Sequence, residues 1–173
     1  MLQEEQKQQL LEWVGIAKQW KIILQTDPDL NVYTGKAFHN ACDGKGENLG
    51  VIRSKQGGYL FGWWTPKSWQ SRGKEPNDNA FISDTSTFIF TLTNPAGVPA
   101  KYMIKKHQYA LYDHVNKGPT LGFSDIEVSG DVSSDLSYTD FPNSYEDTTG
   151  RGEETFTGHL NFIVDDMEVF IPV

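Results

Sequence analysis

Cys42 is the residue whose type is best suited to nucleophilic chemistry, because it is the single cysteine and His39 precedes it by three residues. Residues three apart share one face of a helix, so the imidazole could activate the thiol. The sequence supplies no third group to orient the histidine, and a cysteine in a short apolar helix usually packs. We predict a structural role for Cys42 and keep catalysis as an alternative.

Glu168 is the second candidate, as a general base. It stands in an alternating pattern in which Met167 and Val169 face one side of a strand while Glu168 and Phe170 face the other. If that side is buried, the carboxylate needs an ionic or backbone partner. We predict a structural ion pair, with general-base chemistry as the alternative.

Three patterns resemble ion or phosphate sites, and each fails on spacing. Residues 27–31 alternate oxygen ligands like a calcium loop, but Val32 and Phe38 stand where glycine and a bidentate glutamate are required. Residues 43–48 lack the phosphate-loop spacing and follow a predicted helix instead of a strand. No metal-ligand spacing links the four histidines, which are His39, His107, His114 and His159. The sequence therefore predicts no catalytic set, no metal site and no cofactor.

Aromatic and cationic residues follow one another after a predicted hairpin. Trp63 and Trp64 would face opposite sides of a strand that is apolar on both sides, so this strand should be internal. An exposed ring beside the cations of the polar loop that follows would suit a partner hot spot. The predicted partner surface consists of Trp63, Trp64, Trp69, Lys67, Arg72 and Lys74, with core packing as the alternative for each tryptophan.

Length and composition are typical of one globular domain. The chain has 173 residues, 38% hydrophobic and 13% aromatic, and its ten Phe, seven Tyr and five Trp favour β structure. No apolar run approaches the roughly 18 residues of a membrane helix, and the N-terminus lacks the apolar core of a secretory leader. A single cysteine fits a reducing compartment. We expect a cytoplasmic protein without membrane insertion, with a peripheral position on an organelle membrane or a place in a large assembly as alternatives.

Charge is distributed unevenly. The net charge is −8, and residues 125–173 contain one arginine among many acids, whereas the preceding residues are slightly basic. This balance argues against a nucleic-acid surface. The acidic third could meet a basic partner or remain a solvated face.

The elements that position these residues are mostly strands. Apolar spacing predicts a helix over residues 4–18, and Thr34 could cap a short helix over 37–42. A hairpin turns at Gly57-Gly58, and strands are predicted at 20–25, 88–92, 101–105, 108–113, 121–128, 158–164 and 167–171. Segments 65–79 and 130–154 are predicted loops. We expect a mainly β chain with flanking short helices (α+β), in which an N-terminal helix (1–18) precedes a two-sheet antiparallel β-sandwich (19–173) of nine or ten strands.

A fixed order of short motifs makes the chain resemble the TLDc domain family, the domain shared by the oxidation-resistance proteins. The motifs lie at residues 20–24, 37–46, 51–54, 58–62, 69, 84–92, 118–126, 144–145, 156–162 and 167–170. The signature positions are Phe38, Cys42, Asp43, Gly46, Gly62 and Glu168. Two places depart from the family pattern: Gly62-Trp63-Trp64 replaces a common Gly-Gly-Tyr, and Glu47-Asn48-Leu49 replaces a frequent Pro-Thr-Leu.

The resemblance implies a β-sandwich, protection from oxidative damage and, in several members, regulation of the vacuolar proton-pumping ATPase (V-ATPase), with no established catalytic mechanism. We therefore expect a non-enzymatic interaction module that docks on a larger cytoplasmic assembly. One alternative is a structural component of a cytoskeletal or other large complex. Another is a weak redox or hydrolytic enzyme that uses Cys42 or Glu168.

Overall fold

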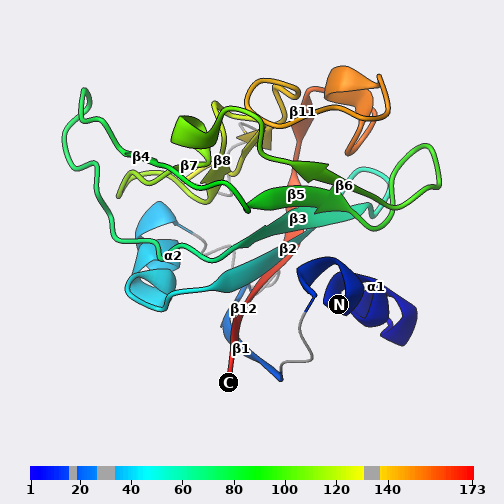
Figure 1. The fold of residues 1–173 in the computed structure, drawn as a ribbon, viewed down its shortest axis with the longest axis horizontal. Coiled ribbons are helices and arrows are strands. Elements are labelled where there is room, and N and C mark those ends of the chain that lie inside the picture. Colours follow the sequence, from blue (N-terminus) through cyan, green and yellow to red (C-terminus); the bar gives the residue numbers. More distant parts are fainter. Residues whose placement is uncertain (16–18, 27–33, 131–136) are drawn as a thin grey trace.

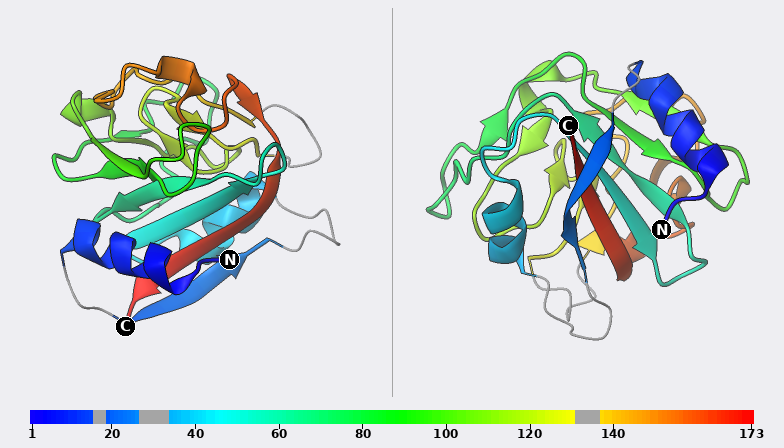
Figure 2. Two further views of the ribbon diagram at one scale, coloured as in Figure 1. Left: turned by 90° about the vertical axis from the view of Figure 1, so that its right-hand side faces the viewer. Right: turned by 90° about the horizontal axis from the view of Figure 1, so that it is seen from below.

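Two antiparallel sheets packed face to face form the body of the protein (Figure 1). The computed structural model describes residues 1–15, 19–26, 34–130 and 137–173. Helix α1 (Glu4–Val14) lies across the outer face of the first sheet, and the second sheet lies on the opposite side (Figure 2). The predicted mainly β sandwich with short flanking helices is confirmed. The turn predicted at 27–31 lies outside the described residues.

The first sheet contains the long strands. Its order is β1 (Trp20–Gln25), β12 (Val164–Pro172), β2 (Asn48–Ser54), β3 (Leu60–Thr65), β5 (Phe88–Thr91) and β6 (Ala100–Met103). The first and last strands of the chain pair with one another, and β12 also pairs with β2. Both faces of β2 and β3 are buried, as their continuous apolar sequences predict.

Two glycines let β2 and β3 approach closely under a tryptophan. A Cβ atom added at Gly50 would lie 2.1 Å from the ring of Trp63, and one added at Gly62 would lie 1.9 Å from the carbonyl oxygen of Gly50. Real Cβ atoms do not come so close, so neither position tolerates a side chain without movement of the strands. The signature Gly62 is therefore a packing residue.

The second sheet contains strands of only two residues each. Its order is β11 (Asn161–Phe162), β10 (Ser137–Tyr138), β9 (Ile126–Glu127), β8 (Thr120–Leu121), β7 (Leu111–Tyr112) and β4 (Phe81–Ile82). Such short ladders supply few hydrogen bonds, so the loops between them must be held by other contacts. Buried side chains supply many of these contacts, as described below.

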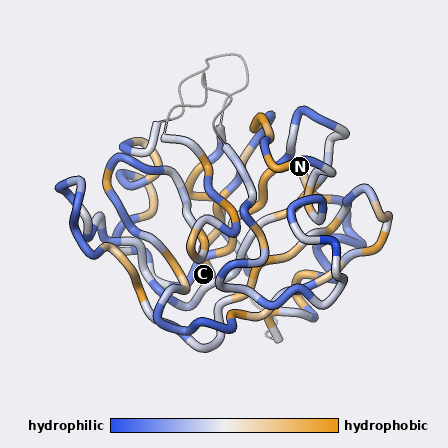
Figure 3. The backbone as a smooth tube through the Cα atoms, turned by 90° about the horizontal axis from the view of Figure 1, so that it is seen from above, coloured by the Kyte–Doolittle hydropathy of each residue, from blue (hydrophilic) through white to orange (hydrophobic). Residues whose placement is uncertain are grey.

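The main core lies between the sheets. In Figure 3, hydrophobic segments (orange) run through the middle of the view, and hydrophilic ones (blue) form much of its outline. It includes Phe38 of helix α2 (Gly35–Cys42), Phe61 of β3 and Phe162 of β11, all buried. A second apolar cluster lies on the outer face of the first sheet, where Leu10 of α1 covers Val51 and Phe90. Among the described residues, no helix has the length and apolar character needed to cross a membrane.

The two helices follow their local signals. Gly15 adopts a left-handed conformation with φ of 78° and ends α1 at Val14. The predicted continuation to residue 18 is therefore wrong at Gly15, and residues 16–18 lie outside the described part. Thr34 caps α2 (Gly35–Cys42) by accepting a hydrogen bond from the Ala37 amide at 3.1 Å, as predicted.

Several predicted strands are interrupted in the structure. The segment 108–113 begins within a 3₁₀-helix, η1 (His107–Tyr109), and only then becomes β7. The segment 121–128 divides into β8 and β9, because Gly122 and Ser124 adopt positive φ angles of 67° and 66° and form a tight turn. The predicted loop 130–154 contains β10 and a second 3₁₀-helix, η2 (Gly152–Glu154). The described residues thus form twelve strands instead of nine or ten.

Candidate functional site

Two of the three tryptophans predicted to bind a partner are core residues. Trp63 and Trp69 are fully buried, and both indole N–H groups donate to the single side-chain oxygen of Asn48, at 2.9 and 3.0 Å. The Asn48 amide nitrogen donates to two backbone carbonyls, those of Gly46 and Lys67, at 2.9 Å each. The prediction is corrected for these two rings: the loop after β3 folds back against α2, where the Gly44 amide donates to the Trp69 carbonyl, and carries Trp69 inward.

The remaining predicted partner residues do not form one surface. Trp64 is half-buried, stacks on Phe88 with ring centroids 5.4 Å apart and donates to Glu47, on the outer face that α1 covers. Arg72 is exposed and donates to the Phe81 carbonyl of the second sheet at 3.2 Å. Lys67 and Lys74 are also exposed. Trp63 and Trp69 thus lie in the core, Trp64 lies on the outer face of the first sheet, and Arg72 contacts the second sheet.

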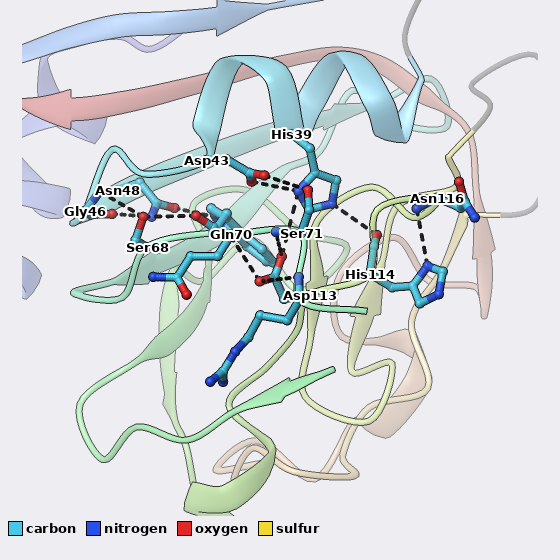
Figure 4. Close-up of polar contacts among 12 residues, drawn as sticks. His39, Asp43, Gly46, Asn48, Ser68, Gln70, Ser71, Asp113, His114 and Asn116 are labelled. Carbon is cyan, nitrogen blue, oxygen red and sulfur yellow. Dashed lines mark hydrogen bonds and ion pairs between the residues drawn. The ribbon is translucent and has the colours of Figure 1, made fainter. Parts of the chain in front are cut away.

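A polar cluster joins α2 to the segments that follow β3 and β7 (Figure 4). His39, on the buried face of α2, has Nδ1 2.8 Å from Asp43 Oδ1 and 3.7 Å from Asp113 Oδ1. Its Nε2 lies 3.0 Å from the backbone carbonyl oxygen of His114. Ser71 donates its hydroxyl to Asp43 Oδ2 at 2.5 Å. We call His39, Asp43, Ser71 and Asp113 the histidine–aspartate cluster.

Asp113 is the most deeply buried member of this cluster. It has no exposed surface and accepts backbone N–H groups from Gln70, Ser71 and Arg72 at 3.0, 3.2 and 3.3 Å. Burial raises the pKa of its carboxyl, while the nearby His39 and the backbone donors act in the opposite direction. Ser71 has a φ of 50°, a strained conformation that the Asp113 contacts hold.

The histidine–aspartate cluster does not have the geometry of a hydrolytic triad. A triad requires the serine hydroxyl to face the imidazole, but Ser71 donates to Asp43 and His39 directs Nε2 at a backbone carbonyl. His39, Asp43 and Asp113 could instead hold a metal ion, since their ligand atoms all lie within 4.8 Å of one another.

The two candidate catalytic residues are both buried. Cys42 is 1% exposed, and burial, followed by the charge of Asp43, raises the pKa of its thiol to about 12. A thiolate is therefore strongly disfavoured. Glu168 is 4% exposed, and its Oε1 lies 3.2 Å from the Met1 nitrogen and 3.4 Å from Gln25 Nε2. It borders a largely apolar hollow of about 460 Å³ between α1 and the first sheet.

The sequence reasoning missed a cluster of aromatic rings at one end of the second sheet. Phe81 lies between three other rings, with centroids 4.8 Å from Tyr109, 4.9 Å from Tyr112 and 5.1 Å from Phe123. Phe123 is 55% exposed, and the other three are partly buried. We call these four residues the aromatic surface. A hollow of about 370 Å³ adjoins it, bordered by Phe81, Tyr112, Phe123 and the polar side chains of Glu127 and Tyr138.

A buried carboxylate holds the exposed ring of Phe123 in place. Asp125 accepts the backbone N–H groups of Asn143, Ser144 and Tyr145 at 2.7, 2.8 and 3.2 Å. The anchored residues then bind the Phe123 backbone: its N–H donates to Ser144 Oγ at 2.9 Å, and its carbonyl accepts from Asn143 Nδ2 at 3.1 Å. These hydrogen bonds hold the turn at Phe123 in one conformation without a partner. The spacing of residues in the sequence does not predict this arrangement.

Comparison with protein families supplies an independent result. A family model described as the TLDc domain matches residues 2–172, which is nearly the whole chain. A comparison with curated proteins finds no match.

Proposed function

Because this chain belongs to the TLDc family, we propose that it is a non-enzymatic protein-interaction module that docks on a larger cytoplasmic assembly. The partner that the family suggests is the vacuolar proton-pumping ATPase, and the cellular role is support of resistance to oxidative damage. The observation that carries the proposal is the aromatic surface, with Phe123 exposed at its tip.

Exposed aromatic rings are the commonest anchors of protein interfaces, because they bury a large area with few rotatable bonds. Phe123 is more than half exposed and rests on Phe81 and Tyr109, so a partner pocket could enclose its free side. Its turn is already ordered by Asp125, and an ordered anchor loses little conformational entropy on binding.

The candidate nucleophile argues against an enzymatic role. Cys42 is buried against the core, and its thiol is held in the protonated form. Cys42→Ser and Glu168→Gln variants that fold and protect cells from oxidants as well as the unaltered protein would support the non-enzymatic proposal; loss of protection in a folded variant would contradict it.

Binding to the purified vacuolar ATPase tests the proposal directly. We expect Phe123→Ala to weaken binding about tenfold or more, as loss of an interface anchor does. Val98→Ala is the matched control, because Val98 is 64% exposed on the turn between β5 and β6 and should not alter binding. Equal binding of Phe123→Ala and the unaltered protein would exclude the aromatic surface, and no binding by either would exclude this pump as the partner.

A further inference from the structure

We infer that His39, Asp43 and Asp113 form a binding site for one divalent transition-metal ion of the zinc type. The inference concerns the histidine–aspartate cluster and is independent of the aromatic surface. One imidazole nitrogen and two carboxylate oxygens converge there from α2, the residue that ends it, and the segment after β7.

Two of the three spacings among the converging atoms are close to those of a tetrahedral metal site, and the two carboxylate oxygens lie within 4.8 Å of one another. With metal–ligand bonds of about 2.0–2.1 Å, two ligands of a tetrahedron lie about 3.3 Å apart. His39 Nδ1 lies 2.8 Å from Asp43 Oδ1 and 3.7 Å from Asp113 Oδ1, so the first pair must separate slightly and the second must close slightly. Both adjustments are within the range of small side-chain rotations.

Each of the three side chains is oriented by a contact on its other polar atom. His39 Nε2 faces the carbonyl oxygen of His114 at 3.0 Å, which leaves Nδ1 to face the centre. Asp113 Oδ2 accepts the Gln70 and Arg72 amides, and Asp43 Oδ2 accepts the Ser71 hydroxyl. Ligating histidines and carboxylates in metalloproteins are oriented by such outer contacts.

The charge of the cluster also favours a cation. Two carboxylates face one imidazole, so even a protonated His39 leaves one negative charge in a largely buried site. Within the described ranges, the ion pairs of Asp43 and Asp113 are both with His39. A divalent ion that replaces the His39 Nδ1 proton would balance both carboxylates.

The ligand set selects the kind of metal. Calcium and magnesium prefer oxygen ligands alone, whereas an imidazole nitrogen beside carboxylates suits zinc and its neighbours. The Asp43 side chain is 30% exposed, in contrast to 4% for His39 and 0% for Asp113. That side offers an entry route and room for a water molecule as the fourth ligand. The bound ion would fasten α2 to the segment after β7.

Metal binding to the intact chain, after treatment with a chelator and its removal, tests the inference. We expect one Zn²⁺ per chain and, at a concentration about 100 times the dissociation constant, a rise in Tm of about 5 to 10 °C. Co²⁺ as a spectroscopic probe should give the visible absorption of a tetrahedral site. A Tm that neither Zn²⁺ nor chelator changes, without such absorption, would show a hydrogen-bonded cluster only and overturn the inference.

Two variants test whether the metal ion binds at the histidine–aspartate cluster and not elsewhere on the chain. Asp43→Asn keeps an acceptor for the Ser71 hydroxyl but loses the ligand charge, so Zn²⁺ affinity should fall at least tenfold while the fold persists. His159→Asn is the control, because His159 is exposed and lies outside the cluster. Unchanged affinity in Asp43→Asn, or lost affinity in His159→Asn, would place the metal elsewhere and contradict the inference.

Discussion

The two sheets of this protein are stabilised in different ways. In the first sheet, strands as long as the nine residues of β12 pair along their length, and the apolar faces of β2 and β3 are covered on both sides. In the second sheet, two-residue strands alternate with loops that the buried carboxylates of Asp113 and Asp125 hold through hydrogen bonds from backbone amides. Both the aromatic surface and the histidine–aspartate cluster involve loops of this second kind. Apolar packing thus supplies the frame, and buried carboxylates position the candidate sites.

The largest effect should follow from removing a ring from the first sheet. Trp63→Ala deletes a fully buried indole over Gly50, and we expect a loss of about 4 kcal/mol in the free energy of unfolding. Urea denaturation measures this loss. Trp64→Ala, which removes a half-buried ring from the next position, should cost clearly less; equal losses would show that burial does not distinguish the two rings.

A smaller but still large effect should follow from removing Asp125 from the second sheet. Asp125→Ala leaves buried amides of the 143–145 segment without acceptors, and we expect a loss of about 3 kcal/mol. Asp125→Asn retains one acceptor oxygen and should lose less. In Asp125→Ala, the amides of residues 143–145 should exchange faster, while exchange in β2 and β3 stays slow. Equally faster exchange in both sheets would argue that the sheets are not stabilised separately.

The contribution of Asp84 to the stability of the fold should depend on pH. This residue lies in the segment that connects β4 of the second sheet to β5 of the first. Burial alone would raise the pKa of Asp84, but four hydrogen bonds from Thr87 and Ser86 outweigh it and hold that pKa below its ordinary value. The carboxylate therefore stabilises the fold above its unfolded pKa of about 3.9, and this contribution disappears as pH falls through the lower folded value.

The variant Asp84→Asn tests this dependence. We expect it to be about 1–2 kcal/mol less stable than the unaltered protein at pH 7. The difference should begin to shrink below about pH 4, where the carboxyl becomes protonated in the unfolded chain, and should disappear only below the lower folded pKa, where it is protonated in both states. Unfolding curves recorded from pH 7 to pH 2.5 measure it, and a difference that does not vary with pH would contradict the assignment.

The smallest effect on stability should come from the aromatic surface. Phe123→Ala removes a ring that is already 55% exposed, so the loss should be about 1 kcal/mol or less, although partner binding should fall sharply. Thermal unfolding beside the binding assay separates the two effects. A large loss of stability would show that Phe123 is a packing residue and would remove the basis for its role as an anchor.

Sequence reasoning recovers the first sheet better than the second for a physical reason. The strand predicted at 20–25 matches β1 in both bounds, because the apolar residues 22–24 stand between polar neighbours and give a clear pattern. The two-residue strands β8 and β9 are too short for a period to be visible, and the turn at Ser124 uses a conformation that serine rarely adopts.

The candidate sites were harder to predict, because their members are distant in sequence. His39 meets the His114 carbonyl across 75 residues, and Phe81 meets Phe123 only through the fold. The burial of Cys42 was predicted from its place in a short apolar helix, whereas for Glu168 the sequence left burial open. For Trp69 core packing was only the alternative to partner binding, because a polar loop gives no sign that it folds back.

The oxygen of Asn48 that receives two indole N–H groups has an evolutionary consequence. Both places where the chain departs from the family pattern meet at this contact: Asn48 stands where threonine is frequent, and Trp63 where glycine is common. If Trp63 were present without an acceptor at position 48, its buried indole N–H would have no hydrogen-bond partner. If Asn48 were present without Trp63, its side-chain oxygen would lose one of its two indole donors. Asn48 and Trp63 therefore depend on one another, and we expect related chains with a tryptophan at the second position to keep an acceptor at the first.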